Sequence, residues 1–237
     1  KMAKTRPSRS RFPARPVPRV GAFFDMDKTL ISENSGSLYL KYLYDRGEMS
    51  EIELARGLGD YLRYKIGVLD LRAWVEAAAG PLAGRTEESV SEEAREWFAE
   101  RVISKIYPEA VDRVSQHLER GDVVAIVSGA TRFIIEPLAE RLRIAHIVCT
   151  QLGVARGHYT GRVIEPVCFE EGKVYWLSEF ATQHGVDLAR SWFYTDSITD
   201  LPLLDRVGHP VVTNPDPLLY LAARRRQWPV LLFNPPR

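Results

Sequence analysis

The chain has 237 residues, of which 45 % are hydrophobic and 27 % charged, enough for an ordinary core in one large domain or a domain with an insert. Its longest apolar runs have the length of a β-strand, too short to cross a bilayer, and no apolar segment typical of a signal peptide follows the basic N-terminus. We therefore expect a cytoplasmic protein without a membrane span.

The N-terminal segment differs from the rest of the chain in charge. Residues 1–19 contain seven Lys or Arg and no acidic residue, whereas the remaining chain has 25 basic and 31 acidic residues. Residues 1–18 are also rich in proline and have little to bury, so we expect a disordered tail. It is either a solvated extension or an electrostatic contact for anionic lipid or nucleic acid. The acidic body argues against a nucleic-acid-binding module.

The first predicted element is a short buried parallel strand at Val20–Phe24, which ends at Asp25. The pattern then becomes helical. From about residue 37 to residue 105, apolar residues recur at helical spacing, and the breaks fall at Gly47, Gly67, Gly80-Pro81 and Gly84. This pattern predicts three or four amphipathic helices with no strand between them. We assign them to a helical cap domain at residues 34–106.

Helices and strands alternate through the rest of the chain. Helices are predicted at Glu109–Arg120, Glu136–Leu142 (with Pro137 in its first turn), Glu171–His184, Leu201–Val207 and Pro217–Arg226. Strands are predicted at Asp122–Val127, Trp192–Thr195 and Pro210–Thr213, with a hairpin of His146–Val154 and Thr160–Glu165 and an edge strand at Val230–Phe233. The alternation predicts an α/β core domain, residues 19–33 and 107–237, with a mostly parallel sheet and helices on both faces.

Three predicted strands end in a polar residue that a buried strand does not need, namely Asp25, Ser128 and Asp196. In a doubly wound sheet, ligands bind outside the carboxyl ends of the strands. The sequence therefore predicts that two carboxylates and a hydroxyl meet at one edge of the sheet and form a site.

Asp25 and Asp27 stand two residues apart on a turn after an apolar strand. Such a pair can face one small volume if a divalent cation offsets its charge, and oxygen ligands favour Mg²⁺. Asp25 can then attack phosphorus and form an aspartyl-phosphate. Asp27, beside a like charge, can keep a proton for the leaving group and later activate water. Taken alone, the pair also fits an Asp that caps a turn.

Three further segments supply groups for the same chemistry. Ser128 and the free N–H groups around Gly129 can hold phosphoryl oxygens, although a simple turn explains them equally well. Lys173 can neutralise nucleophile and phosphate, although a lone Lys is usually solvated. Asp196 can bind the metal and Asp200 can orient a metal-bound water or Lys173, although an acidic helix start has the same pattern.

The two cysteines, Cys149 and Cys168, are too few for a disulfide scaffold and do not have zinc-ligand spacing. We interpret them as buried free thiols of a reducing compartment, with a bond between them as the alternative.

Taken in order, Asp25-x-Asp27-x-Thr29, Ser128, Lys173 and Asp196-x-x-x-Asp200 resemble the four motifs of haloacid dehalogenase-type phosphatases. The helical insert after the first motif is similar to the cap of the subgroup (IB) that includes phosphoserine phosphatase. The resemblance runs from about Val20 to the C-terminus and implies a Rossmann-like fold and a Mg²⁺-dependent phosphatase. It implies that Asp25 is nucleophile and metal ligand, and that Asp27 is acid/base and metal ligand through its carbonyl. It further implies that Thr29, Ser128, Gly129 and Lys173 bind phosphate and that Asp196 binds metal, with Asp200 in support.

The resemblance has one gap, which concerns the substrate. Where phosphoserine-specific members have a Glu that contacts the serine amine, this chain has Asn34, with Glu33 one position earlier. Where they have a cap Arg that contacts the carboxylate, it has Glu76 and Ala78, with Arg72 or Arg63 as possible substitutes. An Ala cannot hold a carboxylate, so we expect a substrate other than phosphoserine. Much of the run Leu38–Tyr44 belongs to ordinary helix–helix core, but a few of its tyrosines can face the site, which suggests a bulkier alcohol such as that of an aromatic or lipid phosphate.

The leading hypothesis is thus a phosphomonoesterase of a small-molecule phosphate ester, acting as a monomer or homodimer. A phosphotransferase or phosphomutase would use the same Asp25 but pass the phosphoryl group to an alcohol. A non-catalytic regulatory binding protein is the alternative from a different class and predicts no turnover.

Overall fold

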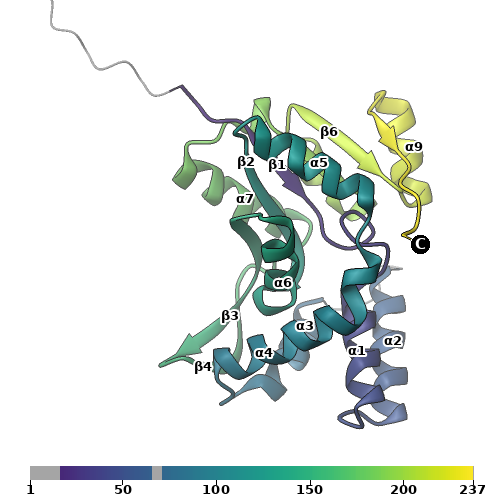
Figure 1. Ribbon diagram of the computed structural model, residues 1–237, viewed down its shortest axis with the longest axis vertical. Helices are drawn as coiled ribbons and strands as arrows, with labels where there is room; N and C mark the ends of the chain where they lie inside the picture. The colour runs from purple at the N-terminus through teal and green to yellow at the C-terminus, as the bar shows by residue number, and fades with distance from the viewer. Residues whose placement is uncertain (1–16, 66–70, 237) are drawn as a thin grey trace, which may run out of the picture.

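The computed structural model describes residues 17–65 and 71–236. Most of the predicted tail and the predicted break at Gly67 therefore lie outside the described residues. Within them, the strands form a seven-stranded sheet in the order β4-β3-β2-β1-β5-β6-β7 (Figure 1). The strands are β1 (Gly21–Phe24), β2 (Val123–Thr131), β3 (His146–Ala155), β4 (His158–Ile164), β5 (Trp192–Thr195), β6 (His209–Thr213) and β7 (Val230–Leu231).

The central strand β1 is buried along its whole length, and its alternating side chains separate two hydrophobic cores. Ala22 and Phe24 face a core shared with helices α5 (Pro108–Glu119) and α6 (Arg132–Leu142). Phe23 faces the other core, shared with α7 (Glu171–His184), α8 (Leu201–Leu204) and α9 (Pro217–Arg226). Neighbouring strands are parallel except in the β3–β4 hairpin. The predicted α/β fold, with helices on both faces of a mostly parallel sheet, is confirmed.

The segment between β1 and α5 is helical, as predicted. It contains α1 (Ser35–Asp45), α2 (Glu51–Lys65), α3 (Leu71–Ala79) and α4 (Glu87–Trp97), gathered at one end of the sheet in Figure 1. Short helical turns complete the chain at Gly80–Leu82, Phe98–Val102, Ile103–Lys105, Leu188–Arg190 and Ile198–Asp200.

The helical segment enters and leaves the sheet through two chains that lie side by side. Ile31 pairs with Ile106 in an antiparallel bridge. The N–H of Ser32 donates to the Lys105 carbonyl at 2.8 Å, and the N–H of Tyr107 donates to the Leu30 carbonyl at 3.0 Å. When a segment is inserted into a domain, the chain that enters the segment and the chain that leaves it are expected to lie side by side, as they do here.

Several predicted boundaries were wrong. Strand β2 continues past Val127 to Thr131, because a register shift between Ser128 and Thr131 lets it resume pairing with β3. Helix α6 begins at Arg132, so Pro137 lies inside the helix; burial of the apolar side chains in its first turn supports that turn. Strand β7 ends at Leu231 and α8 at Leu204, both earlier than predicted.

Two features of the described residues bear on earlier expectations. No helix among them is both long and apolar enough to cross a membrane. Cys149 and Cys168 are free and buried, and burial raises the pKa of the Cys149 thiol to about 12. The interpretation of both residues as buried free thiols is confirmed, and no disulfide joins them; the reducing compartment stays a prediction.

Gly172, in the first turn of α7, provides a test of how this helix is placed. A Cβ at this position would lie 1.8 Å from the Val167 carbonyl oxygen, so Gly172→Ala must move the start of the helix. We expect it to destabilise the fold by about 1–3 kcal/mol in chemical denaturation. Gly59→Ala in α2 is the control, because a Cβ there meets nothing within 4 Å. Equal stability of the two variants would show that α7 tolerates displacement.

Candidate active site

The polar residues predicted at strand ends meet in one cavity of about 400 Å³ at the carboxyl edge of the sheet. Asp25 follows β1, and its N–H donates to the Tyr194 carbonyl of β5 at 2.9 Å, so the ladder between the two strands holds its backbone. Asp196 follows β5, and Ser128 and Gly129 stand at the register shift of β2. All four residues line the cavity.

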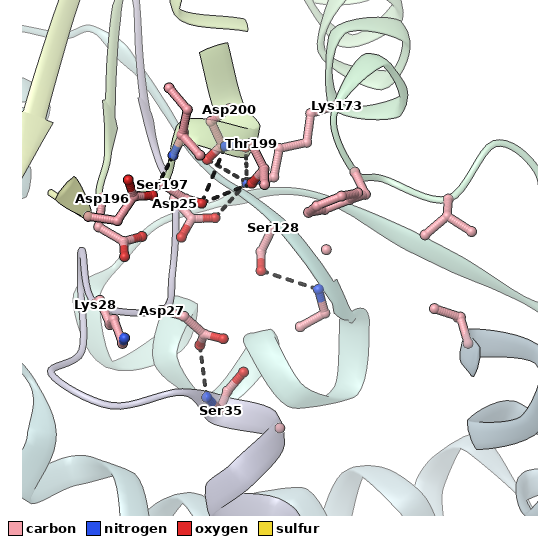
Figure 2. A pocket seen from close by; sticks show the side chains of 18 of the residues that line it. Asp25, Asp27, Lys28, Ser35, Ser128, Lys173, Asp196, Ser197, Thr199 and Asp200 are labelled. Carbon is pink, nitrogen blue, oxygen red and sulfur yellow. Dashed lines mark hydrogen bonds and ion pairs between the residues drawn. The ribbon is translucent and has the colours of Figure 1, made fainter. Parts of the chain in front are cut away.

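Lys173 joins this group from the first turn of α7. Its Nζ lies 2.7 Å from Asp25 Oδ1 and 2.8 and 2.9 Å from the two oxygens of Asp200. Figure 2 shows these three side chains converging at one end of the cavity. Thr195 donates to Asp200 Oδ2 at 2.5 Å, which fixes the carboxylate that in turn positions the ammonium. The side chains of Lys173 and Asp200 are only 5 % and 1 % exposed.

Asp27 lies apart from the Lys173 cluster and contacts the start of α1 (Figure 2). The N–H of Ser35 donates to Asp27 Oδ1 at 2.9 Å, and the side-chain amide of Asn34 donates to Oδ2 at 2.7 Å. Asn34 is also the N-cap of α1, because its Oδ1 accepts the N–H of Ser37 at 2.8 Å. The helical insert and Asp27 are therefore coupled by direct hydrogen bonds.

Burial dominates the electrostatics of the site. It raises the pKa of Asp25 to about 7, with the charges of Asp200 and Asp27 adding to the effect and Lys173 opposing it. Burial likewise raises the pKa of Asp27, against the hydrogen bonds from Ser35. Burial alone would lower the pKa of Lys173, but the carboxylates of Asp200 and Asp25 outweigh it and raise that pKa.

The charges that line the cavity are unbalanced. Five aspartates and two lysines contribute to its wall, namely Asp25, Asp27, Asp196, Asp200, Asp216, Lys28 and Lys173. A divalent cation would relieve this excess, and the donor set consists of oxygen, which suits Mg²⁺. No three His, Cys, Asp or Glu side chains of the described residues gather closely enough to hold an ion by themselves. A cation here would thus also use a backbone carbonyl and water, as Mg²⁺ commonly does.

Thr29 is the one predicted site residue that the structure does not bring to the cavity wall. It is 1 % exposed, and its Oγ1 accepts a hydrogen bond from the Thr213 hydroxyl at 3.3 Å. Its placement supports the turn after β1 more than a direct contact with phosphate.

Sequence reasoning missed several residues that shape the site. Asp216 caps α9 and also accepts the N–H of Ile198 at 2.7 Å, which fixes the loop after Asp196. Its position before Pro217 carried a helix-start signal that could have pointed to it. Ser35 had no such signal, because only the fold brings it to Asp27, whereas Lys28 and Thr195 stand next to Asp27 and Asp196 in the sequence.

Comparison with known proteins agrees with this geometry. Residues 22–205 match the family model described as haloacid dehalogenase-like hydrolase. A protein of Neisseria meningitidis serogroup C (strain 8013) named histidinol-phosphatase is 36 % identical over 218 residues, which is 90 % of this chain and 98 % of that protein.

Two solved structures show how far the likeness extends. A protein of unknown function from Bordetella pertussis Tohama I has a TM-score of 0.83 at 30 % identity and covers 91 % of this chain and 99 % of its own. A phosphoserine phosphatase with an analogue of its phospho-aspartyl intermediate has a TM-score of 0.65 at 18 % identity. The match covers 92 % of this chain and 95 % of that one. The chain belongs to the haloacid dehalogenase-like hydrolases and is an enzyme of their phosphatase type, with the phosphoserine phosphatase fold.

Proposed function

We propose that the protein is a Mg²⁺-dependent phosphomonoesterase that hydrolyses a small-molecule phosphate ester through an aspartyl-phosphate on Asp25. One observation carries the proposal. The Asp25 carboxylate lies at the end of the central strand, inside a cavity, with Oδ1 held 2.7 Å from the buried Lys173 ammonium. A carboxylate oriented in this way and kept from bulk water is prepared for attack.

The reaction divides between the two aspartates of the first motif. Asp25 Oδ2 attacks phosphorus as the bond to the ester oxygen breaks, and protonated Asp27 gives its proton to the leaving alkoxide. Water then attacks phosphorus of the aspartyl-phosphate, Asp27 takes its proton, and inorganic phosphate leaves. The burial that raises the pKa of Asp27 helps it to hold the first proton.

The remaining site residues bind the transferred group. Lys173, Ser128 and the N–H groups near Gly129 hold phosphoryl oxygens, and Asp200 keeps Lys173 in place. Mg²⁺ would be held by Asp25, the Asp27 carbonyl and Asp196. When bound, it offsets negative charge on carboxylate and phosphate, which is the Lewis-acid role of a metal in phosphoryl transfer.

The helical insert acts in this proposal as a cap at residues 34–106. The paired chains around Ile31 and Ile106 are the connection about which it would move. Because Asn34 and Ser35 donate to Asp27, the position of the cap also sets the position of the proton donor. Closure would exclude water until the leaving group has departed.

Besides the metal, the residue roles and the cap, the cytoplasmic location, the monomeric or dimeric state and transfer to water rather than to an alcohol also stay predictions. A phosphotransferase would share every step up to the aspartyl-phosphate. The family membership and the histidinol-phosphatase name of a 36 % identical relative favour hydrolysis over transfer and over a non-catalytic regulatory role.

The nucleophile is tested by Asp25→Asn. With Mg²⁺ and a panel of phosphomonoesters that includes histidinol phosphate and phosphoserine, we expect phosphate release to fall by at least about a thousandfold, because the attacking group is lost. Asp112→Asn, an exposed position in α5, is the matched control and should keep full activity. Substantial turnover by Asp25→Asn would contradict the mechanism.

Mg²⁺ binding is tested through its pH dependence. Because the pKa of Asp25 is about 7 in the metal-free protein, the folded state keeps a proton that the unfolded chain loses near pH 4. The contribution of Asp25 to metal-free stability should therefore decrease as pH rises from 4 to 7, by about 2–4 kcal/mol. Mg²⁺ binds the ionised form and should raise the midpoint of thermal unfolding more at pH 8 than at pH 5. Equal shifts at both pH values would exclude Asp25 as a ligand.

The role of Asn34 is separable from its role as a helix cap. Asn34→Ala removes both the cap and the donor to Asp27, and should cost about 0.5–2 kcal/mol of stability. Asn34→Ser keeps a capping oxygen and should retain stability. Both variants should lower kcat about tenfold, since the donor that orients the Asp27 carboxyl is lost. If Asn34→Ser kept the wild-type kcat, Asn34 would act only as a helix cap.

A further inference from the structure

A second cavity, of about 190 Å³, continues from the phosphate site into the helical insert. The two cavities share part of their walls, formed by Ser35, Gly36, Trp74, Val75, Gly129 and Ala130. A phosphoryl group bound near Asp25 therefore has the second cavity on the side of the cap helices. The second cavity thus borders the reacting centre and can receive the alcohol part of a phosphate ester.

The walls of this second cavity are apolar. Beyond the shared residues, α3 and the turn after it contribute Ala78, Ala79 and Leu82, and α6 contributes Phe133 and Ile134. No charged side chain belongs to the described residues that line it. A charged group placed there would lose its water without gaining a partner, which is costly.

Tyr39 is the aromatic residue of α1 that reaches this cavity. Its hydroxyl donates to Glu93, so the ring is left as part of the wall, 5.6 Å from the Trp97 ring and 6.3 Å from the Phe133 ring between centroids. Two other tyrosines of the run have different roles. Tyr42 is fully buried in the core, and Tyr44 donates to Glu51 at 3.2 Å. Among these three tyrosines, only Tyr39 lines the cavity.

The size of the cavity limits its occupant. An apolar cavity of about 150 Å³ can hold a benzene ring. A volume of about 190 Å³ therefore accommodates one ring and a short linker, and is small for a diacyl lipid.

We propose that the second cavity binds the alcohol part of the substrate, and that this alcohol carries a single uncharged ring on a short chain and no carboxylate. The inference rests on the proposed phosphatase function and specifies its substrate class. Burial of the ring supplies the binding energy. The described residues of the wall include no charged side chain, so the cavity selects against an alcohol that carries a carboxylate, such as serine.

The test compares three phosphoryl donors with the wild-type protein and Mg²⁺. They are 3-phenylpropyl phosphate, phosphoserine and acetyl phosphate, which has no ring to place in the cavity. We expect kcat/KM for 3-phenylpropyl phosphate to exceed that for phosphoserine by about tenfold or more. Adding 2-amino-3-phenylpropyl phosphate to the series measures what an ammonium on the linker costs. Faster turnover of lysophosphatidate than of 3-phenylpropyl phosphate would overturn the single-ring assignment.

Filling the cavity provides the second arm. Three successive alanines of α3 differ in position: Ala78 and Ala79 line the cavity, whereas Ala77 is exposed and outside it. The ratio of kcat/KM for 3-phenylpropyl phosphate to that for acetyl phosphate should fall about tenfold in Ala79→Phe, since the added ring takes the place of the ligand's. If Ala79→Phe fails to fold, Ala78→Phe provides the test, because its position is exposed. The same ratio of kcat/KM should fall in this variant. Ala77→Phe is the control and should leave the ratio unchanged.

The outcomes separate this inference from the proposed function. If acetyl phosphate is hydrolysed in an Asp25-dependent reaction but the ratio is the same in the wild type, Ala78→Phe and Ala77→Phe, the cavity does not bind the alcohol and the inference is wrong. If neither acetyl phosphate nor any ester is hydrolysed, the proposed function itself fails.

Discussion

The ammonium of Lys173, buried between the carboxylates of Asp25 and Asp200, is the interaction on which the rest of the site depends. Each carboxylate is largely buried, with 10 % of the Asp25 side chain and 1 % of the Asp200 side chain exposed, and would be costly to ionise alone. The ammonium compensates both, so removing it would leave two like charges in a buried place, a loss that typically costs about 3–5 kcal/mol. The fold therefore holds Lys173 in place through contacts from several elements.

That position comes from three separate elements. The chain before α7 passes so close to Gly172 that no side chain fits there, which brings the first turn of the helix against the sheet edge. Thr195, the last residue of β5, holds Asp200. The ladder between β1 and β5 holds the backbone of Asp25. The acidic excess of the cavity fits the proposed divalent cation, whose charge would in turn offset that of a phosphate dianion in the same space.

Much of this was visible in the sequence, for identifiable reasons. Short apolar runs that alternate with helical patterns predicted the sheet, and the polar residues at the ends of these runs placed Asp25, Ser128 and Asp196 at one edge. What the sequence did not show depends on contacts between distant segments. The bulge in β2 arises from pairing with β3, and the Asn34–Asp27 contact needs the cap to fold back on the turn after β1. The sequence also did not show which tyrosines of the Leu38–Tyr44 run face the site: Tyr39 lines the second cavity, whereas Tyr42 lies in the core.

The central claim is that Asp25 carries the phosphoryl group. It is tested most directly by mixing the protein with a phosphate ester and Mg²⁺, quenching rapidly and reducing with borohydride, which converts an aspartyl-phosphate to homoserine. Peptide mass spectrometry should find homoserine at position 25 alone. Turnover with no modification of Asp25, or with a phosphoryl group on another residue such as Ser128, would contradict the account.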